Sequence, residues 1–388
     1  MNIHNSIEHQ PLQVKCIEIS KSEIPSIQQK WLILAEKTET QFFLSWRWIA
    51  NWLNQVIDDN KIVLVSAHSY TSEIIALGLF VEKKSNKLGL IPCTQWFLHR
   101  TGKRNYDQIW IENNNFLIAK GYEESALTNI WRYLSQSQPH VDEFIISVSK
   151  GKTTNQKHLP NSYSLYKSDL HSGYKVNLHN YKDLNDYLSQ LSKNTRQQVN
   201  RSISLLNKSA AIELKIWNTD QFSILNKHKH LHIKKWKNTN TPSGFSNPLF
   251  EEFHQQLNSA QDFAYSQNIY TLVAEINSGE AILGCAYYLV DHGHIYFYLA
   301  CLSKIENNKL KLGLAIHAKV IEWLILNKPE INVYDFLAGD ARYKKSLAQT
   351  TEAYCNLIIY KKNYKYLLSV TFKSIKDRLW KIFNNYRA

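Results

Sequence analysis

The sequence predicts an α/β (α+β) fold in which mixed central sheets are flanked by helices and one structural unit is present twice. Segments with the two-residue period of a strand alternate along the chain with segments of helical period. Residues 63–83 and 271–291 share the same order of strand, polar turn, glutamate, apolar pair and second strand. With 388 residues, the chain is long enough for two domains that each bury a core.

The composition indicates a folded protein that meets acidic partners. With 44% hydrophobic and 20% charged residues, the chain has the balance of a globular protein. Its net charge of +13 favours contact with phosphate groups, tRNA or an anionic membrane face. Five dispersed cysteines without a CxxC pair indicate a reducing compartment. Because no apolar run has the length of a signal peptide core or a membrane span, we predict a cytoplasmic protein.

The first half reads as a sheet with helices on it. Trp48, Trp52 and Val56 lie one helical turn apart, and we interpret them as a face packed on that sheet. Residues 150–160 are polar and break every period, so we predict domains over 1–160 and 161–363, followed by a basic amphipathic helix over 364–388. The predicted strands are 13–19, 61–67, 73–82 and 142–148, and the predicted helices are 24–36, 42–56 and 122–135.

The second half repeats this pattern with a longer set of strands. Its helix over 191–208 carries a basic face that includes Arg196, and a solvated surface is the simpler interpretation of that face. The predicted strands are 174–178, 211–217, 269–276, 281–290, 294–300 and 354–360, and the predicted helices are 191–208, 221–237, 249–266 and about 310–326.

Residues 332–347 combine a strand, a turn and charged side chains. Asp335 lies inside an apolar and aromatic run, where a carboxylate seldom occurs without a partner. Gly339 suits the positive φ of a turn. Asp340, Tyr343 and Lys344 then follow at the carboxyl end of a strand, where open α/β sheets bind their ligands.

A second group of candidates lies on the helix over 221–237. His228 and His232 are one turn apart, a spacing that can bind zinc. No carboxylate stands between them in the HExxH manner, so an exposed basic helix is the favoured interpretation and no metal site is predicted.

The order of several motifs resembles a known family. DFLAGDARYK at 335–344 is similar to the C-terminal signature of GNAT-type acyltransferases of the CelD-like and FemAB-like kind. The upstream pieces appear in that family's order: Ser-Lys-x-x-Arg at 192–196, HxxxW at 232–236, Phe245 followed by Phe253-His254, and a tyrosine-rich hairpin. The resemblance implies tandem GNAT-like domains, of which the first is degenerate.

This resemblance also implies an activity, namely transfer of an acyl group from acyl-CoA, with acetyl-CoA expected, to an amine of a sugar or cell-envelope precursor. His232 is the candidate base, because a histidine with a pKa near neutrality suits removal of a proton from an amine. Asp335 or Asp340 would orient it or act instead, Tyr343 would protonate the leaving thiolate, and Lys344 would contact an anion or a carbonyl group.

The resemblance assigns binding roles as well. Arg196 would face an anionic group, and Trp236 would line the acceptor side with Tyr296 and Tyr298. In the GNAT fold the CoA pyrophosphate rests on a helix N-terminus, where free N–H groups and the helix dipole favour anions. That segment holds the candidates Lys309, Lys311, Leu312, Gly313 and Leu314. The family usually has a Pro-Gly pair there, and this chain has Leu312-Gly313 instead.

Two other functions are compatible with the sequence. A FemAB-like ligase would use aminoacyl-tRNA as its donor, and the high positive charge favours that reading. A catalytically silent protein of the same fold would bind carbohydrate or a membrane surface. The basic helix over 364–388 either lies on anionic lipid, giving a peripheral membrane contact, or packs on the first domain.

Overall fold

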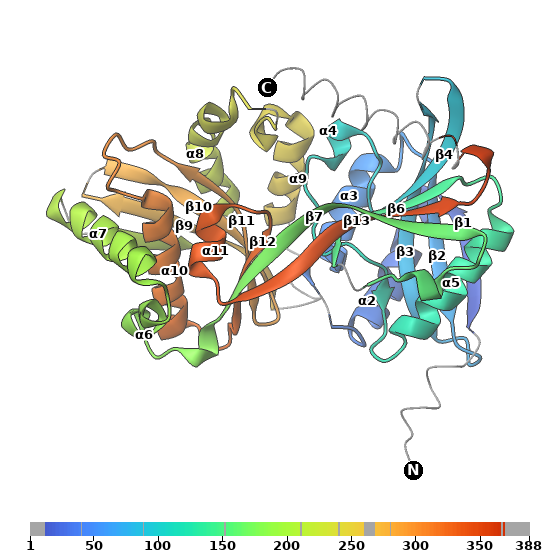
Figure 1. Ribbon diagram of the computed structural model, residues 1–388, viewed down its shortest axis with the longest axis horizontal. Helices are drawn as coiled ribbons and strands as arrows, with labels where there is room; N and C mark the ends of the chain where they lie inside the picture. Colours follow the sequence, from blue (N-terminus) through green and yellow to red (C-terminus); the bar gives the residue numbers. More distant parts are fainter. Residues whose placement is uncertain are drawn as a thin grey trace, which may run out of the picture.

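The computed structural model describes residues 12–365 and 368, apart from 40, 88, 151–152, 210–211, 240, 260–267 and 280. Figure 1 shows two halves side by side, with the first half in blue and teal and the second in yellow-green to orange. The C-terminal helix predicted over 364–388 lies almost wholly outside the described residues. None of the described helices is long and apolar enough to cross a membrane.

One mixed sheet runs through both halves, in the order β1-β2-β3-β4-β6-β13-β7-β12-β11-β10-β9-β8. Within each half the strands are antiparallel except at one place, where β4 pairs with β6 and β11 with β12 in parallel. The first half contains β1 (Gln13–Ile19), β2 (Ile62–His68), β3 (Ile74–Lys87), β4 (Ile91–Leu98), β5 (Leu117–Ile118), which pairs with β3, and β6 (Glu143–Lys150). The second half contains β8 (Ile212–Trp217), β9 (Ile269–Ser278), β10 (Ala281–Asp291), β11 (His294–Leu302) and β12 (Val333–Ala338).

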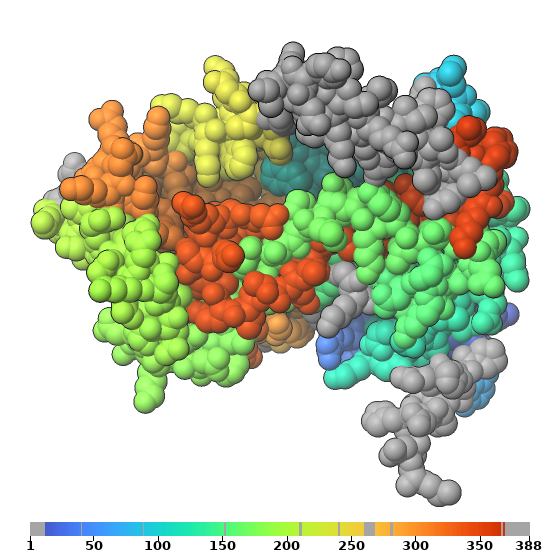
Figure 2. All heavy atoms as spheres, in the orientation of Figure 1, coloured from blue at the N-terminus to red at the C-terminus, as the bar shows by residue number. Residues whose placement is uncertain are grey.

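Two long strands, β7 (Tyr163–Asn177) and β13 (Thr350–Lys361), join the halves by exchange. β7 follows β6 in the chain but pairs with β12, whereas β13 follows the second half and pairs with β6. The two strands also pair with each other along most of their length, and their green and red side chains cross the middle of the molecule together in Figure 2. The sequence predicted only the last residues of β7, because its first ten residues mix polar and apolar side chains and most of them are partly or fully exposed.

Helices cover both faces of the sheet. In the second half, α6 (Leu184–Ser189), α7 (Lys193–Ser209) and α10 (Leu312–Asn327) bury one face, while α8 (Gln221–Trp236) and α9 (Pro248–Ser259) bury the other. The core under α8 and α9 is continuous with the core of the first half, which packs α2 (Ile24–Ala35), α3 (Trp46–Val56) and α5 (Glu123–Ser137). The halves therefore share this apolar core, while the core under α6, α7 and α10 is a separate cluster of the second half.

The tryptophan face predicted on α3 is confirmed as core. Trp48 and Trp52 are almost fully buried, and the Trp48 ring meets Phe253 of α9 edge-on at 4.7 Å between ring centres. From the same helix, the Arg47 guanidinium donates to the Leu257 carbonyl at 2.6 Å and to the Ile269 carbonyl at 3.0 Å. Helix α3 thus fixes α9 and the start of β9 to the first half.

Both halves open at the same place in the sheet. β11 and β12 pair only from His294/Val333 to Tyr296/Asp335, and β4 and β6 pair over an equally short stretch. Each second strand then carries a bulge with a left-handed residue, Leu337 in β12 at φ 62° and Val148 in β6 at φ 50°. We call the last paired residues, Tyr296 and Asp335, the splay point of the second half.

Candidate active site at the splay point

Asp335 holds the bulge at the splay point. Its Oδ1 accepts a hydrogen bond from the Leu337 amide at 2.7 Å, which stabilises the left-handed conformation of that residue. The carboxylate is almost fully buried, and this burial raises its pKa, although the neighbouring Lys175 ammonium opposes the rise. Asp335 therefore has polar partners, the Leu337 amide and the Lys175 ammonium, as expected for a carboxylate in an apolar strand.

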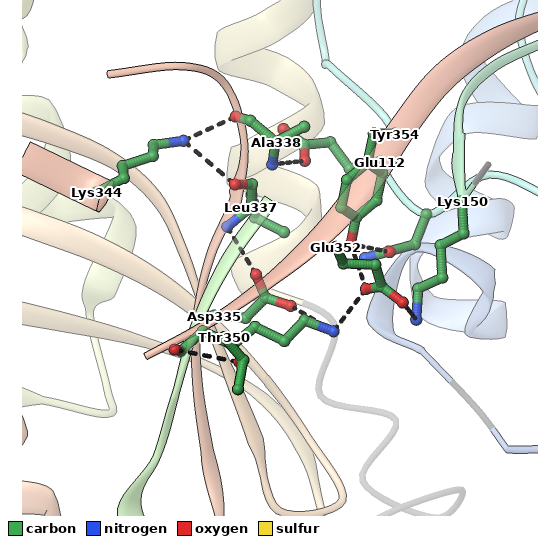
Figure 3. A network of polar contacts seen from close by, with 11 residues as sticks. Glu112, Lys150, Asp335, Leu337, Ala338, Lys344, Thr350, Glu352 and Tyr354 are labelled. Carbon is green, nitrogen blue, oxygen red and sulfur yellow. Dashed lines mark hydrogen bonds and ion pairs between the residues drawn. The ribbon is translucent and has the colours of Figure 1, made fainter. Parts of the chain in front are cut away.

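Lys175 of β7 connects Asp335 to β13. Its ammonium lies 3.4 Å from Asp335 Oδ2 and donates to Glu352 Oε2 at 2.8 Å, and Glu352 also pairs with Lys150 at 3.4 Å. Figure 3 shows this chain of charges lying beneath the end of β12. Two carboxylates and two ammonium groups balance one another, as a half-buried network requires.

Glu112 enters the same region from the first half, and no motif or period in the sequence marks it. The Ala338 amide donates to Glu112 Oε2 at 2.7 Å across a separation of 226 residues. Burial raises the pKa of this carboxyl to about 7, although the Lys344 ammonium acts in the opposite direction. A carboxyl group with that pKa can give and take a proton near neutral pH.

Lys344, predicted from the sequence, lies on the other side of the same strand end. It projects from α11 (Arg342–Leu347), and its ammonium donates to the Ala338 carbonyl at 2.7 Å. Burial lowers its pKa, and the charges of Glu112 and Asp335 oppose that shift. Gly339 has φ 127°, and a Cβ at that residue would come within 3.4 Å of the Lys344 ammonium. The predicted glycine turn is confirmed and sets the position of the lysine.

Tyr343 and Asp340, the other candidates from this motif, differ in their surroundings. The Tyr343 ring stacks on His317 at 5.3 Å, and burial raises its pKa to about 12. Asp340 is exposed, and it accepts hydrogen bonds from His171 Nδ1 at 3.0 Å and from the Ser172 amide at 3.1 Å. Those hydrogen bonds lower the pKa of Asp340.

His232 is a buried side chain on α8. Its Nδ1 lies 2.7 Å from Ser243 Oγ, its ring packs against Trp236 at 5.9 Å, and burial lowers its pKa to about 4. Across the described part of the chain, no hydrogen bond or ion pair joins His232 to Asp335 or Lys344. His228 bonds Glu275 at 2.7 Å, and the described residues contain no cluster of three metal-binding side chains.

The other candidates for substrate binding are dispersed. The Tyr298 hydroxyl donates to the Ile109 carbonyl of the first half, so this tyrosine fixes the chain that carries Glu112. Tyr296 is buried, with its ring stacked on His294. Arg196 lies on α7 and donates to the Ser189 carbonyl at 3.1 Å.

The start of α10 contains the candidate residues for the donor. The Lys311 amide donates to Ser202 Oγ of α7 at 2.9 Å, and the side chains of Lys309 and Lys311 are exposed. Leu312 and Leu314 are buried and anchor the first turn. A Cβ added at Gly313 would meet only Leu302, at 4.0 Å, so packing within the protein does not require glycine here.

Comparison with known proteins matches this part of the chain to a family. Residues 193–345, which include β11, α10, β12 and Lys344, match the profile of the acetyltransferase (GNAT) domain. The chain carries a GNAT acyltransferase domain. That domain contains the parallel strands β11 and β12, which open at the splay point, and α10, which connects them.

Solved structures show the same overall fold across both halves of the chain. FemX matches with 9% identity and a TM-score of 0.56, covering 92% of this chain and 99% of its own. L-PGS from Bacillus licheniformis matches with 12% identity and a TM-score of 0.51, covering 94% and 99%. A conserved protein of unknown function from Bacteroides thetaiotaomicron VPI-5482 matches with 10% identity and a TM-score of 0.51, covering 90% and 100%. No curated protein matches in sequence.

The polar network of the site extends beyond the GNAT match. Asp335 and Lys344 lie inside residues 193–345, whereas Glu112, Lys175 and Glu352 lie outside them. The sequence predicted the first two residues because they share one local motif. It missed the other three because strand exchange and the fold of the first half bring them in from distant parts of the chain.

Proposed function

We propose that this protein is an N-acyltransferase that moves an acyl group from acyl-CoA to an amine of a sugar or cell-envelope precursor. The observation that carries this proposal is the splay point, where β11 and β12 stop pairing, together with the start of α10, where Gly313 lies next to Leu302 at the end of β11. Backbone groups of the unpaired strand ends and the N–H groups of a helix start are the elements that a thioester arm and a pyrophosphate need.

Gly313 supports binding of the donor at α10. The residue lies in the first turn without a positive φ and with room for a larger side chain, so the protein itself gains nothing from glycine there. Glycine does allow a ligand to approach the backbone closely. The exposed ammonium groups of Lys309 and Lys311 add positive charge at the same end of the helix, which also carries the positive pole of its dipole.

Direct acyl transfer needs few groups from the protein. The amine nitrogen attacks the thioester carbonyl carbon, a C–N bond forms, the C–S bond breaks, and the amine loses one proton while the thiolate gains one. Lys344 is suited to stabilise the charge on the carbonyl oxygen because it is a half-buried cation at the end of β12. Tyr343 would donate the proton to the thiolate.

The base is assigned among three side chains of the GNAT domain, His232, Asp335 and Asp340. If His232→Ala and Asp340→Asn both keep full turnover, neither of these two side chains is the base. Asp335→Asn keeps an acceptor for the Leu337 amide and removes the charge, so its turnover reports on the carboxylate itself.

A substitution at Gly313 tests the donor site. Gly313→Ala should fold normally, because the site has room for a methyl group. The variant should be more stable by up to about 1 kcal/mol, because alanine is the better helix former. We expect the variant to bind acetyl-CoA at least about 10-fold more weakly, because the added methyl group would lie where the donor approaches the backbone. Leu326→Ala, an exposed change at the far end of α10, is the matched control. Equal acetyl-CoA affinity in native protein and Gly313→Ala would contradict the donor site.

Transfer from aminoacyl-tRNA is the second candidate. The net charge of +13 and the Leu312-Gly313 departure from the family pattern favour it. Thermal-shift titration with acetyl-CoA, CoA and bulk tRNA separates the two, because only the true donor stabilises the folded state by mass action. If carbohydrate or lipid vesicles raise the melting temperature and neither donor does, the protein is a silent binder of the same fold.

The acceptor is proposed to be a small molecule or a glycan. The five cysteines are unpaired thiols, which supports a reducing compartment such as the cytoplasm. A peripheral membrane contact through residues 364–388 remains a proposal of the sequence alone.

A further inference from the structure

We propose that Glu112, supplied by the N-terminal half, takes the proton from the attacking amine, so that the reaction site is shared between the two halves. This inference rests on the proposed acyl transfer and replaces the base expected within the GNAT domain.

The segment 109–114 is attached to both strands that open at the splay point. On β11, the Tyr298 hydroxyl donates to the Ile109 carbonyl; on β12, the Ala338 amide donates to Glu112 Oε2 at 2.7 Å. Both anchor residues lie beyond Tyr296 and Asp335, the last pair of the two strands. The Glu112 carboxylate therefore lies at the open end of the splay point, where the acyl group of a bound donor is expected.

The rest of this segment is held rigidly. Asn113 accepts from the Tyr354 hydroxyl at 2.7 Å, and Asn114 donates to the Leu98 carbonyl at 2.7 Å. Trp110 and Asn113 have left-handed backbones, with φ of 46° and 51°, a conformation that costs free energy and persists only where the surroundings fix it. A carboxylate on such a segment is preorganised rather than mobile.

One oxygen of Glu112 is available for chemistry. Oε2 accepts from the Ala338 amide, while Oε1 forms no hydrogen bond or ion pair with any of the described residues. The pKa of about 7 fits a base that must be ionised at neutral pH and still accept a proton. The charged and titratable groups that face it are Lys344 of α11, Asp335 of β12, Tyr298 of β11 and Tyr354 of β13.

The alternative bases are less suited. His232 is bonded to Ser243, and burial lowers its pKa to about 4, which makes it a poor proton acceptor. Asp335 is committed to the Leu337 amide and to Lys175. Asp340 is exposed and bonded to His171, away from the strand end that Lys344 contacts. Glu112 is the carboxylate with a raised pKa, a free oxygen and a place at the open strand ends.

The proton balance is simple. The amine nitrogen forms the C–N bond to the thioester carbonyl carbon, its proton passes to Glu112 Oε1, and the C–S bond breaks with the electron pair on sulfur. The Lys344 ammonium beside Glu112 stabilises the carboxylate before the proton arrives. Tyr343 gives its proton to the thiolate, and the proton on Glu112 then reprotonates Tyr343 through solvent, so both side chains return to their starting state.

Glu112→Gln is the direct test, because the amide keeps an acceptor for the Ala338 amide and loses the basic oxygen. Thiol release from acetyl-CoA is measured with a panel of amino sugars and amino acids as acceptors, from about pH 5 to 9. We expect kcat to fall about 100-fold or more, and the rise in rate through a pH near 7 to disappear. Glu123→Gln, an exposed glutamate of the same half, is the matched control.

A second variant guards against a purely structural effect. Glu112→Ala should regain part of its rate when formate is added, since formate can occupy the vacated position and accept the proton. Unchanged acetyl-CoA binding in both variants, measured by thermal shift, would show that the donor site is intact. Full turnover in Glu112→Gln, or a pH profile identical to that of the native protein, would overturn the inference. A native protein that binds no donor and turns over no acceptor would instead contradict the proposed function.

Discussion

In each half, the second strand of the parallel pair has a bulge where the pair opens. The two halves differ in the side chains that lie at this bulge. In the second half, Asp335 of β12 faces Lys175 of β7 across the bulge. At the corresponding place in the first half, Ile146 of β6 faces Leu357 of β13, and both are fully buried. An ion pair at this position is not needed to build the fold, since an apolar pair does so in the other half. The fold therefore does not require charges at this position.

The halves also differ in what lies between their opened strands. In the first half, Asn114 joins the strand ends itself: its side chain donates to the Leu98 carbonyl of β4 at 2.7 Å, and its amide donates to the Val148 carbonyl of β6 at 3.2 Å. In the second half, the side chains of Glu112 and Lys344 bond to β12, Glu112 at the Ala338 amide and Lys344 at the carbonyls of Leu337 and Ala338. In the first half, Asn114 thus bridges the opened ends of β4 and β6. In the second half, charged side chains lie at the opened end of β12.

The largest expected effect comes from breaking the ion pair of the second half. Lys175→Met leaves the Asp335 charge buried without its partner, and we expect a loss of roughly 3 to 5 kcal/mol in unfolding free energy by chemical denaturation. The double variant Asp335→Leu with Lys175→Leu copies the apolar pair of the first half, and it should be far more stable than the single variant yet inactive. A double variant as unstable as Lys175→Met would contradict the equivalence of the two positions.

Asn114 tests the closed half. Asn114→Ala removes the donor to the Leu98 carbonyl and the acceptor for His99 Nδ1, which are both buried. We expect a loss of roughly 2 to 4 kcal/mol, because each orphaned group keeps its desolvation cost. Asn115→Ala, one residue further along, is the matched control for urea denaturation. A negligible loss in Asn114→Ala would show that the side chain does not close the first half.

A smaller effect is expected from Glu112, and it depends on pH. The folded state raises the pKa of Glu112 to about 7, so its contribution to stability is complete below its ordinary pKa and is lost as the pH rises through about 7. Glu112→Gln cannot ionise and avoids this loss. The melting temperature of the variant relative to the native protein should therefore be higher at about pH 8 than at about pH 5. A constant difference would mean that the pKa is not raised.

The smallest effect is expected at Asp340. This side chain is exposed and shares its hydrogen bonds with His171 and Ser172 at the surface, so Asp340→Asn should leave the melting temperature unchanged within error. Its turnover decides between the catalytic role expected from the motif and a role in fixing the turn. A marked loss of kcat with unchanged stability would return Asp340 to the list of candidate bases.

The sequence alone predicted the features that depend on short stretches of chain. Strand and helix periods identified the mixed α/β fold and the repeated unit, and the motif over 335–344 identified the GNAT family. The same motif supplied Asp335, Gly339 and Lys344, because a strand, a positive-φ turn and a short helix keep these residues together whatever the rest of the chain does. The backbone conformation of such a short stretch depends mainly on the residues within it.

The tertiary structure alone decided which residues complete the site. The exchange of β7 and β13 brings Lys175 and Glu352 to Asp335, and the attachment of the segment 109–114 to β11 and β12 brings in Glu112. No local period marks Glu112, since its pKa and its place arise from burial against residues more than two hundred positions away. Contacts of that range depend on how the two halves pack, which a pattern in one stretch of sequence does not contain.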